Sequence, residues 1–236
     1  MEVAGLAVEV VRKRMRTIRL TISPPQGSLR VSAPLRASDA DVRAMVLGRL
    51  DWIARHRERM RANPGPAPLR LESGEALHHL GRARRLEVRE RPGRSCVQLE
   101  EGATGPVLAL CVPPGSDEAA RWRALWRWQK AELAARIPAL LEKWQPILGV
   151  RAIAWTIRRM KSRWGTCSLR TRRITLGLSL CARHPACLEY VVVHELAHLI
   201  ERGHNARFYA VLDRVLPGWR AVRRSLSEEL PGSGAA

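Results

Sequence analysis

The chain has 236 residues, with 41 Lys and Arg against 22 Asp and Glu, and a formal net charge of +19. Hydrophobic residues make up 46% and charged residues 27%, which is typical of a folded globular protein and excludes disorder over most of the length. The positive charge attracts anions, including nucleic acid, and predicts weak electrostatic nucleic-acid binding. Arginine is scattered through every segment, however, so a solvated basic surface explains the charge equally well.

Cysteine usage and the lack of long apolar runs indicate the compartment. The five cysteines are odd in number and contain no C-x-x-C pair, which argues against a disulfide framework and against a thiolate zinc site. The first apolar run carries Glu2 and Glu9, unlike a secretory signal. No run approaches the roughly 20 apolar residues that a membrane span needs. We therefore expect a cytoplasmic protein that does not enter a membrane.

The first half of the chain predicts strands with one helix. Apolar and basic side chains alternate over residues 6–33 on either side of a P-P-Q-G turn, which is typical of strands. Ser38, with an acid three residues later, forms a capping box, and apolar residues at helical spacing extend the helix to about Met60. Short β-like runs separated by turns follow from Ala76 to Val112. Residues 1–115 are expected to form a small β-rich N-terminal lobe.

The second half predicts a helical lobe over residues 116–236. A long helix begins at Ser116-Asp117-Glu118, and its tryptophans at helical spacing are more typical of a core than of base stacking. A strand and a hairpin follow, and Pro185 begins a helix that we expect to end at Gly203. Two more helices are predicted, one from Asn205 and one after Pro217-Gly218. The fold class is therefore α+β.

The motif H-E-L-A-H in the predicted helix at Pro185 is the strongest chemical signal in the sequence. His194 and His198 are four residues apart, so both imidazoles project from one helix face and can share one metal ion. A catalytic Zn²⁺ has three protein ligands and a water whose pKa it lowers, and a nearby carboxylate takes the proton. Glu195 fits that general-base role. Chance occurrence on a surface helix is less consistent with the strongly apolar neighbouring positions.

A third ligand is needed, and His204 is the leading candidate because it follows Gly203, where the chain can turn back towards the metal. Its spacing equals that of the metzincin signature, but Glu201 occupies the required glycine position and no methionine follows Met160, which excludes that class. An acidic third ligand is the alternative, and the candidates are Glu201, Asp213, Glu228 and Glu229.

The sequence resembles the YgjP-like metal-dependent hydrolases, which are zincin-like metallopeptidases related to SprT-like and WLM proteases. The resemblance includes K-S-R-W-G-T-C-S, R-I-T-L-G-L-S-L, L-E-Y-V-V-V-H-E-L-A-H-L and G-H-N-A-R-F-Y in the second half. It extends back to L-R-V-S-A-P, D-W-I-A-R-H and H-H-L-G-R-A-R-R-L in the first half, so that it covers essentially the whole chain. It implies a β-rich lobe packed on a zincin-like lobe that carries the H-E-x-x-H helix.

The resemblance also implies the roles of individual residues. It places one Zn²⁺ on His194, His198 and His204, with Glu195 as general acid and base. The R-W-G-T-C-S strand resembles the zincin edge strand that pairs with an extended substrate, which makes Trp164, Gly165 and Thr166 candidate substrate contacts. Packing of Trp164 over the motif helix explains that residue equally well. The resemblance does not say what stabilises the charge that develops during the reaction besides zinc, and Arg163 and Tyr209 are our candidates for this role.

Three functions remain open at this point. The first is a zinc metallopeptidase, which acts on a peptide or protein. The second is hydrolysis of a nucleoside triphosphate, because the family is also associated with UTP pyrophosphohydrolysis and arginine suits a phosphate-rich ligand. The third is a nucleic-acid-associated protease or a binding protein with a structural metal, for which DNA affinity would fall steeply with salt.

Overall fold

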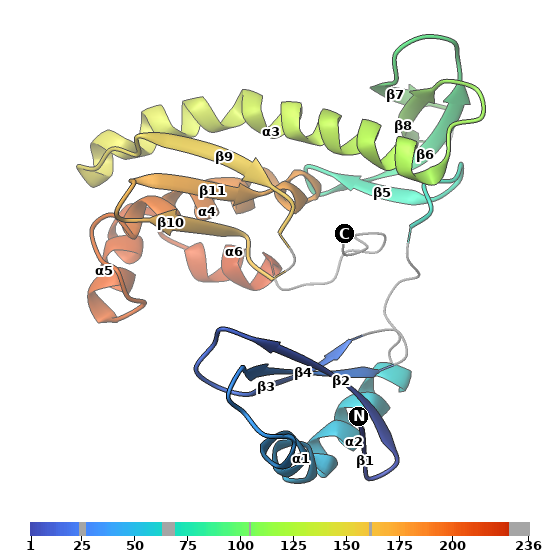
Figure 1. Cartoon of the computed structure of the whole chain (residues 1–236). Coiled ribbons are helices and arrows are strands. Elements are labelled where there is room, and N and C mark those ends of the chain that lie inside the picture. Colours follow the sequence, from blue (N-terminus) through green and yellow to red (C-terminus); the bar gives the residue numbers. More distant parts are fainter. Residues whose placement is uncertain (24–26, 63–68, 104, 161, 227–236) are drawn as a thin grey trace. The chain divides into compact units, whose positions relative to one another are not determined.

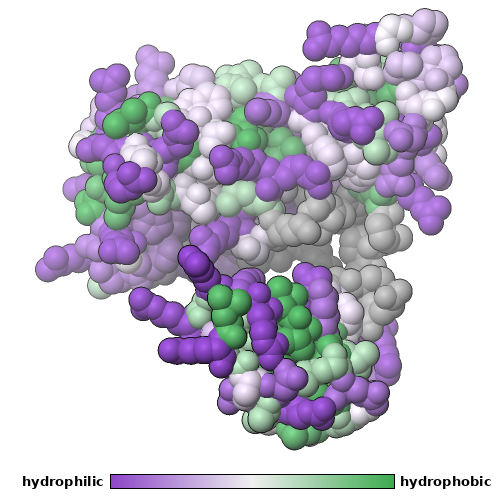
Figure 2. Space-filling view, in the orientation of Figure 1, coloured by the Kyte–Doolittle hydropathy of each residue, from purple (hydrophilic) through white to green (hydrophobic). Residues whose placement is uncertain are grey.

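The computed structural model describes residues 1–23, 27–62, 69–103, 105–160 and 162–226, and it divides into two compact units, Met1–Ala67 and Pro68–Ala236. Figure 1 shows a mixed α+β fold, which confirms the predicted fold class. No helix among the residues in these ranges is long and apolar enough to cross a membrane. Figure 2 shows hydrophilic side chains over much of the visible face of each unit, as the net charge predicts.

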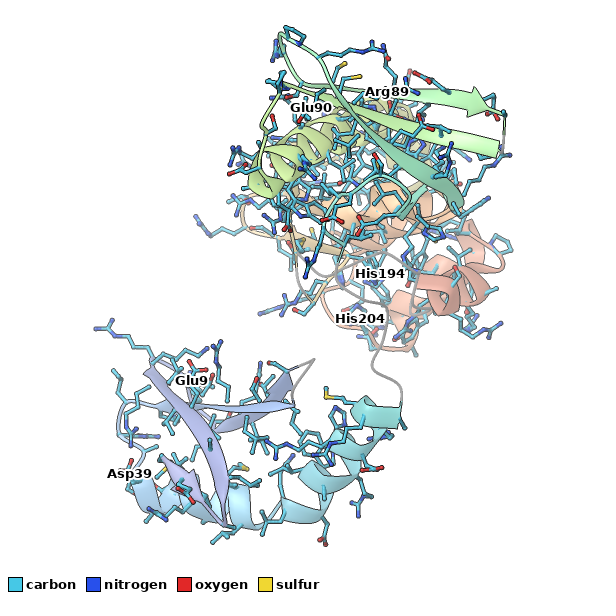
Figure 3. The ribbon with its side chains drawn as sticks, turned by 90° about the vertical axis from the view of Figure 1, so that its right-hand side faces the viewer. Glu9, Asp39, Arg89, Glu90, His194 and His204 are labelled. Carbon is cyan, nitrogen blue, oxygen red and sulfur yellow. The ribbon has the colours of Figure 1, made fainter. Side chains whose placement is uncertain are left out.

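The first unit is a four-stranded sheet with two helices. Its strands are β1 (Glu2–Val3), β2 (Leu6–Lys13), β3 (Arg19–Ser23) and β4 (Ser28–Pro34), in the order β1-β2-β4-β3. β2 and β4 are parallel and the other two pairs are antiparallel. The buried residues of β4 form one hydrophobic core with Val42, Val46 and Ile53 of the helices. Surface ion pairs join Arg12 to Asp39 and Arg30 to Glu9, whose acids are labelled in Figure 3.

The single helix predicted from Ser38 to Met60 is two helices, α1 (Asp39–Leu47) and α2 (Leu50–Ala62). The capping box is confirmed, since Asp41 N donates to Ser38 Oγ and Ser38 N donates to Asp41 Oδ2. Gly48 caps α1 and divides the predicted helix. Glycine costs roughly 1 kcal/mol in a helix interior, and this local signal outweighs the continuing apolar period.

The second unit begins with a sheet of the same topology as the first. Its strands are β5 (Ala76–His79), β6 (Arg82–Glu90), β7 (Cys96–Gly102) and β8 (Gly105–Val112), in the order β5-β6-β8-β7 with β6 and β8 parallel. Buried residues of β8 form one core with Ala124 and Leu125 of α3 (Glu118–Leu148). This sheet therefore belongs with α3, and the structure divides the chain after Ala67, whereas the sequence predicts a boundary after residue 115.

The helix α3 has 31 residues and reaches a second core in the same unit. Its C-terminal half packs against a three-stranded sheet of order β10-β11-β9, formed by β9 (Ala154–Arg158), β10 (Gly165–Ser168) and β11 (Arg173–Gly177). The predicted hairpin is confirmed, because β10 and β11 are antiparallel neighbours. A short 3-10 helix, η1 (Leu178–Ala182), leads to α4 (Pro185–Ala197), α5 (Ala206–Val215) and α6 (Trp219–Leu226). Figure 1 shows α3 passing along β9–β11 and on to β6–β8.

A buried histidine joins the two halves of the second unit. His79 of β5 is 3% exposed, its Nε2 lies 3.1 Å from Glu132 Oε2 of α3, and its ring contacts Trp128. Its neighbour His78 does not share these contacts, as expected for adjacent residues of one strand. Burial lowers the pKa of His79 from its ordinary value of 6.5, against the opposing effect of Glu132. His79 is therefore a neutral structural residue at neutral pH.

We expect the free energy of unfolding to fall as the pH is lowered through about 6.5, in part because of His79. The unfolded chain binds a proton at this histidine near pH 6.5, whereas the folded chain resists protonation until a lower pH, so acid favours unfolding. Urea denaturation at several pH values measures this. The His79→Gln variant, in which the amide can still bond to Glu132, should lose less stability than the parent between pH 7 and roughly pH 5.5. Equal losses in both proteins would contradict the assignment.

Candidate metal centre and substrate cavity

The helix α4 carries the H-E-x-x-H motif at its C-terminal end. Pro185 is its first residue, and His184 caps it by accepting a hydrogen bond from Ala186 N at Nδ1. Its buried residues are almost all apolar and face both the three-stranded sheet and the later helices. His194 and Glu195 lie in the last turn and His198 is the C-cap residue.

The motif helix ends six residues before Gly203, where the sequence predicts its end. Hydrogen bonds from Leu199 N to Leu196 O and from Ile200 N to Ala197 O form a tight turn directly after His198. His198 Nδ1 lies 3.3 Å from Glu201 O, so this turn also engages the histidine side chain. The early end leaves the chain free to turn back, and it brings His204 to the face of α4 that carries His194 and His198.

The three histidines converge on one point. Ligand atoms of His194, His198 and His204 all lie within 4.8 Å of one another, and the Nε2 atoms of His194 and His204 are 3.0 Å apart. Figure 3 shows the His194 and His204 side chains close together in the second unit. The Nδ1 atoms of His194 and His198 are engaged with Tyr190 Oη, at 3.4 Å, and with Glu201 O. Partners at Nδ1 fix the ring orientation and leave each Nε2 available to a shared ion.

Phe208 forms the apolar base of the histidine cluster. It is the only phenylalanine in the chain and is fully buried, and its ring centroid lies 5.0, 4.7 and 4.9 Å from those of His194, His198 and His204. Asn205 places it at the start of α5, because its side chain accepts a hydrogen bond from Phe208 N. Sequence reasoning missed this residue, although its position four residues after His204 is a usable signal.

Burial keeps His194 and His198 in the protonation state that binds a metal. It lowers the pKa of His194 to about 3, and the neighbouring His198, His204 and Arg223 add to the shift. Burial also lowers the pKa of His198. Both imidazoles are therefore neutral near pH 7, and a neutral imidazole is the form that coordinates a cation.

Glu195 lies beside the histidines as a buried carboxyl. It is 4% exposed, and its Oε2 has no hydrogen-bond partner among the residues that the structure describes. Burial raises the pKa of Glu195 to about 8, and Arg163 opposes the rise. A buried oxygen without a partner is costly unless water or a cation is close by. Three imidazole nitrogens together with this oxygen therefore fit a divalent cation and a water molecule.

The strand β10 crosses α4 so closely that only glycine fits at residue 165. A Cβ atom there would lie 2.5 Å from Glu195 Oε1 and 2.9 Å from Val191 Cγ1. β10 is an edge strand, because it pairs with β11 on one side and with no other strand in the described ranges. Its free edge can pair with an extended chain.

We expect the Gly165→Ala variant to lose up to about 100-fold in kcat/KM, because the added methyl group displaces either Glu195 or the strand. Gly203→Ala is the matched control. A Cβ at Gly203 meets nothing nearer than Asn205 Nδ2 at 3.9 Å, although this glycine also lies close to the histidines. The comparison is made on metal-loaded protein with one and the same substrate. Equal activity of the two variants would show that the close approach of β10 is not needed.

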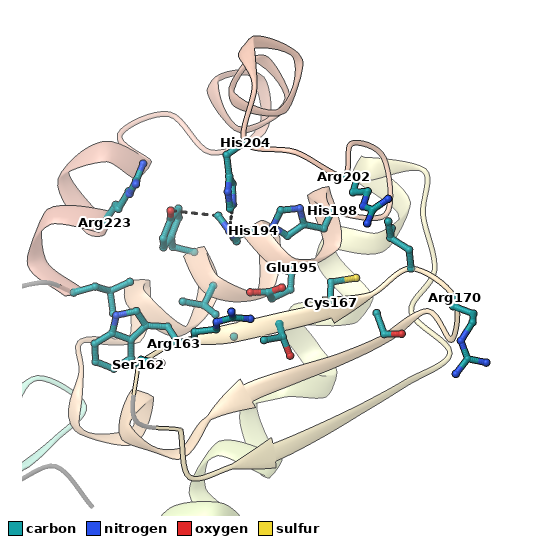
Figure 4. Close-up of a pocket in the computed structure, with 18 residues that line it drawn as sticks. Ser162, Arg163, Cys167, Arg170, His194, Glu195, His198, Arg202, His204 and Arg223 are labelled. Carbon is teal, nitrogen blue, oxygen red and sulfur yellow. Dashed lines mark hydrogen bonds between the residues drawn. The ribbon is translucent and has the colours of Figure 1, made fainter. Parts of the chain in front are cut away.

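A cavity of about 1050 Å³ lies over the histidines and Glu195 (Figure 4). Predicted substrate contacts Arg163, Trp164, Gly165 and Thr166 all line it. Tyr209 is not among its lining residues; its ring stacks on Trp219, with ring centroids 5.5 Å apart, and lies 6.5 Å from the ring of His204. Sequence reasoning missed several lining residues, namely Tyr190, Arg170, Arg202 and Arg223.

The acidic residues that were alternative third ligands either form hydrogen bonds with other groups or lie outside the described residues. Asp213 accepts hydrogen bonds from Trp219 Nε1, at 2.8 Å, and from Arg220. The Glu201 carboxylate faces the backbone N–H of Gly203. Glu228 and Glu229 lie outside the described residues. Of the groups that could hold a metal ion, the one found within the described ranges is the histidine cluster, which contains no cysteine.

Three imidazoles that meet beside a buried carboxyl, at the floor of a cavity with an open strand edge, define a metal-dependent hydrolase of the metallopeptidase type. A model of the YgjP-like metallopeptidase domain matches residues 16–229, and the chain belongs to this family. The resemblance noted from the sequence is thereby confirmed.

Two solved structures are similar to part of the chain. The metallopeptidase zymogen abylysin of Pyrococcus abyssi matches with 26% identity and a TM-score of 0.36, over 38% of this chain and 90% of that chain. The metallopeptidase zymogen jannalysin of Methanocaldococcus jannaschii matches with 18% identity and a TM-score of 0.35, over 39% of this chain and 93% of that chain. A search of curated proteins found no match.

Proposed function

We propose that the protein is a zinc metallopeptidase in which His194, His198 and His204 hold one Zn²⁺ and Glu195 is the general base. The observation that carries the proposal is the convergence of three imidazoles beside a buried carboxyl, one oxygen of which has no hydrogen-bond partner among the described residues. A set of three histidine nitrogens suits zinc and leaves one coordination position open. When bound, the zinc ion supplies Lewis acidity, which polarises a carbonyl oxygen and lowers the pKa of a water molecule.

Residues of the chain transfer the proton, orient the imidazoles, bind the substrate and stabilise charge. Glu195 accepts the proton of the attacking water and passes it to the leaving amine. Burial raises the pKa of Glu195, and the positive charge of a bound cation would lower it again, so that the carboxylate form is available to accept the proton. Tyr190 and the carbonyl of Glu201 orient two of the imidazoles. The substrate backbone pairs with the open edge of β10, which holds the peptide bond next to Glu195. Arg163, whose charge already acts on Glu195, is the candidate for stabilising the developing negative charge.

Hydrolysis of a nucleoside triphosphate, UTP in particular, is the second candidate function. The observation that favours it is the set of arginines that line the cavity, because guanidinium groups bind phosphates well. The match to the YgjP-like metallopeptidase family does not support the nucleic-acid binding that the net charge suggests.

One experiment separates the two candidate functions. Zinc-loaded protein is incubated with a peptide mixture, an unfolded protein and the four ribonucleoside triphosphates, and the products are identified by mass spectrometry. The proposal predicts cut peptides, with no cleavage by the Glu195→Gln variant. If UMP and pyrophosphate were formed without any peptide product, the proposed peptidase activity would be wrong, and the same site would instead hydrolyse a phosphoanhydride bond.

A further inference from the structure

The cavity over the histidines is strongly and asymmetrically charged. Four arginines line it: Arg163 before β10, Arg170 in the turn after β10, Arg202 in the loop after α4, and Arg223 in α6. Glu195 is the one carboxylate among the lining residues that the structure describes. Guanidinium groups from four separate segments therefore surround a single buried carboxyl.

A few arginines of the same unit are paired with acids, whereas the four that line the cavity are not paired with any acid that the structure describes. Arg89 pairs with Glu87 and Glu100, Arg136 pairs with Glu132, and Arg220 pairs with Asp213. Within the described ranges, no ion pair joins Arg163, Arg170, Arg202 or Arg223 to an acid. Cations that gather around a cavity without forming ion pairs with the protein attract and orient an anionic ligand.

The arginines are spread along the direction that a substrate would take. In Figure 4, Arg163 lies beside Glu195, Arg223 lies on one side of His194, and Arg202 and Arg170 lie on the other. The edge strand β10 runs between these two sides. A chain paired with β10 advances about 3.3 Å per residue, so its side chains on both sides of the cut bond meet a guanidinium group within a few residues.

We propose that the cavity selects peptides that carry Asp or Glu on both sides of the bond that is cut, an inference that rests on the proposed peptidase function. The two-sided distribution favours an acidic peptide over a mononucleotide, whose phosphates concentrate the charge at one end. The open edge of β10 also offers backbone hydrogen bonds, which an extended peptide can use. Acidic side chains therefore supply the charge complement that the protein itself does not provide.

The first measurement is a cleavage survey. Zinc-loaded full-length protein is given a proteome-derived peptide library, and the cut sites are mapped by mass spectrometry. We expect Asp and Glu to be enriched on both sides of the cut bond. A peptide with a frequent cut site is then compared with its Asn and Gln counterpart, and the charged form should have a kcat/KM on the order of tenfold higher, since each exposed ion pair contributes up to about a factor of five. Salt should reduce this difference.

Charge reversal tests the two sides separately. Arg170→Glu and Arg223→Glu should each lower cleavage of the acidic peptide and raise that of a matching Lys peptide, with the zinc content unchanged. Arg214→Glu makes the same change of net charge on α5, outside the cavity lining, and should leave the preference unaltered. Arg170→Gln, which adds no negative charge, should give a smaller loss than Arg170→Glu.

The possible failures are distinguishable. Cut peptides without acidic enrichment, and equal rates for the Glu and Gln peptides, would overturn the substrate preference and leave the peptidase function standing. Nucleotide hydrolysis without any cut peptide would overturn the peptidase function, and the acidic-peptide inference with it. The comparison of the two peptides uses the unaltered protein, so a variant that fails to fold does not affect it.

Discussion

Glu195→Gln is expected to lower kcat by about 10²- to 10⁴-fold, while one zinc ion per chain stays bound. Removal of a general base costs this much in rate, because the amide that replaces the carboxylate cannot take the proton of the attacking water. The substitution leaves the three clustered imidazoles unchanged, so metal binding should persist. Peptide cleavage and zinc content by mass spectrometry measure the two effects on the same sample.

Glu142→Gln is the control for this experiment, since Glu142 is an exposed carboxylate of α3 outside the cavity lining. It should keep both activity and zinc. A Glu195→Gln enzyme with the parent rate would refute the general-base role. Loss of zinc from the Glu195→Gln variant would instead mean that this carboxylate helps to hold the metal.

His198→Ala is expected to abolish activity and to weaken zinc binding by more than about 100-fold. Loss of a residue that only hydrogen-bonds to a metal ligand weakens metal binding by about 10- to 100-fold, and loss of a ligand itself should cost more. Two imidazoles then remain, and they leave the ion without its third nitrogen. Zinc binding to the native state raises the free energy of unfolding, so added zinc should raise the Tm of the parent protein but hardly that of the variant. Zinc per chain after dialysis and thermal melts with and without zinc measure these effects.

His56→Ala removes a histidine from α2 of the first unit and serves as the control. It should retain both the zinc content and the zinc-dependent rise in Tm. Zinc at the parent level in His198→Ala would exclude this residue as a ligand, and the acidic alternatives Glu228 and Glu229 would then have to be tested.

Local features of the site are visible in the sequence because helix geometry alone produces them. Four residues make just over one turn, so the spacing of His194 and His198 places both rings on one face. The hairpin of β10 and β11 follows from two β-like runs and a basic turn. Asn205 is the N-cap residue of α5, a position where asparagine is strongly preferred. The single helix predicted over residues 38–60 is wrong, because Gly48 interrupts a pattern that apolar periodicity alone would continue.

The sequence by itself determined the α+β class, the start of the motif helix at Pro185 and the spacing of its two histidines, since these depend on side-chain patterns within a few turns of chain. Only the tertiary structure decided the surroundings of these residues. It placed Phe208 under the three rings, Gly165 against Glu195, and four arginines from separate segments around one cavity. It also assigned the β5–β8 sheet to the unit of α3, because the two share a core. Contacts between residues far apart in the chain depend on how whole elements pack, and no local pattern of side chains specifies that packing.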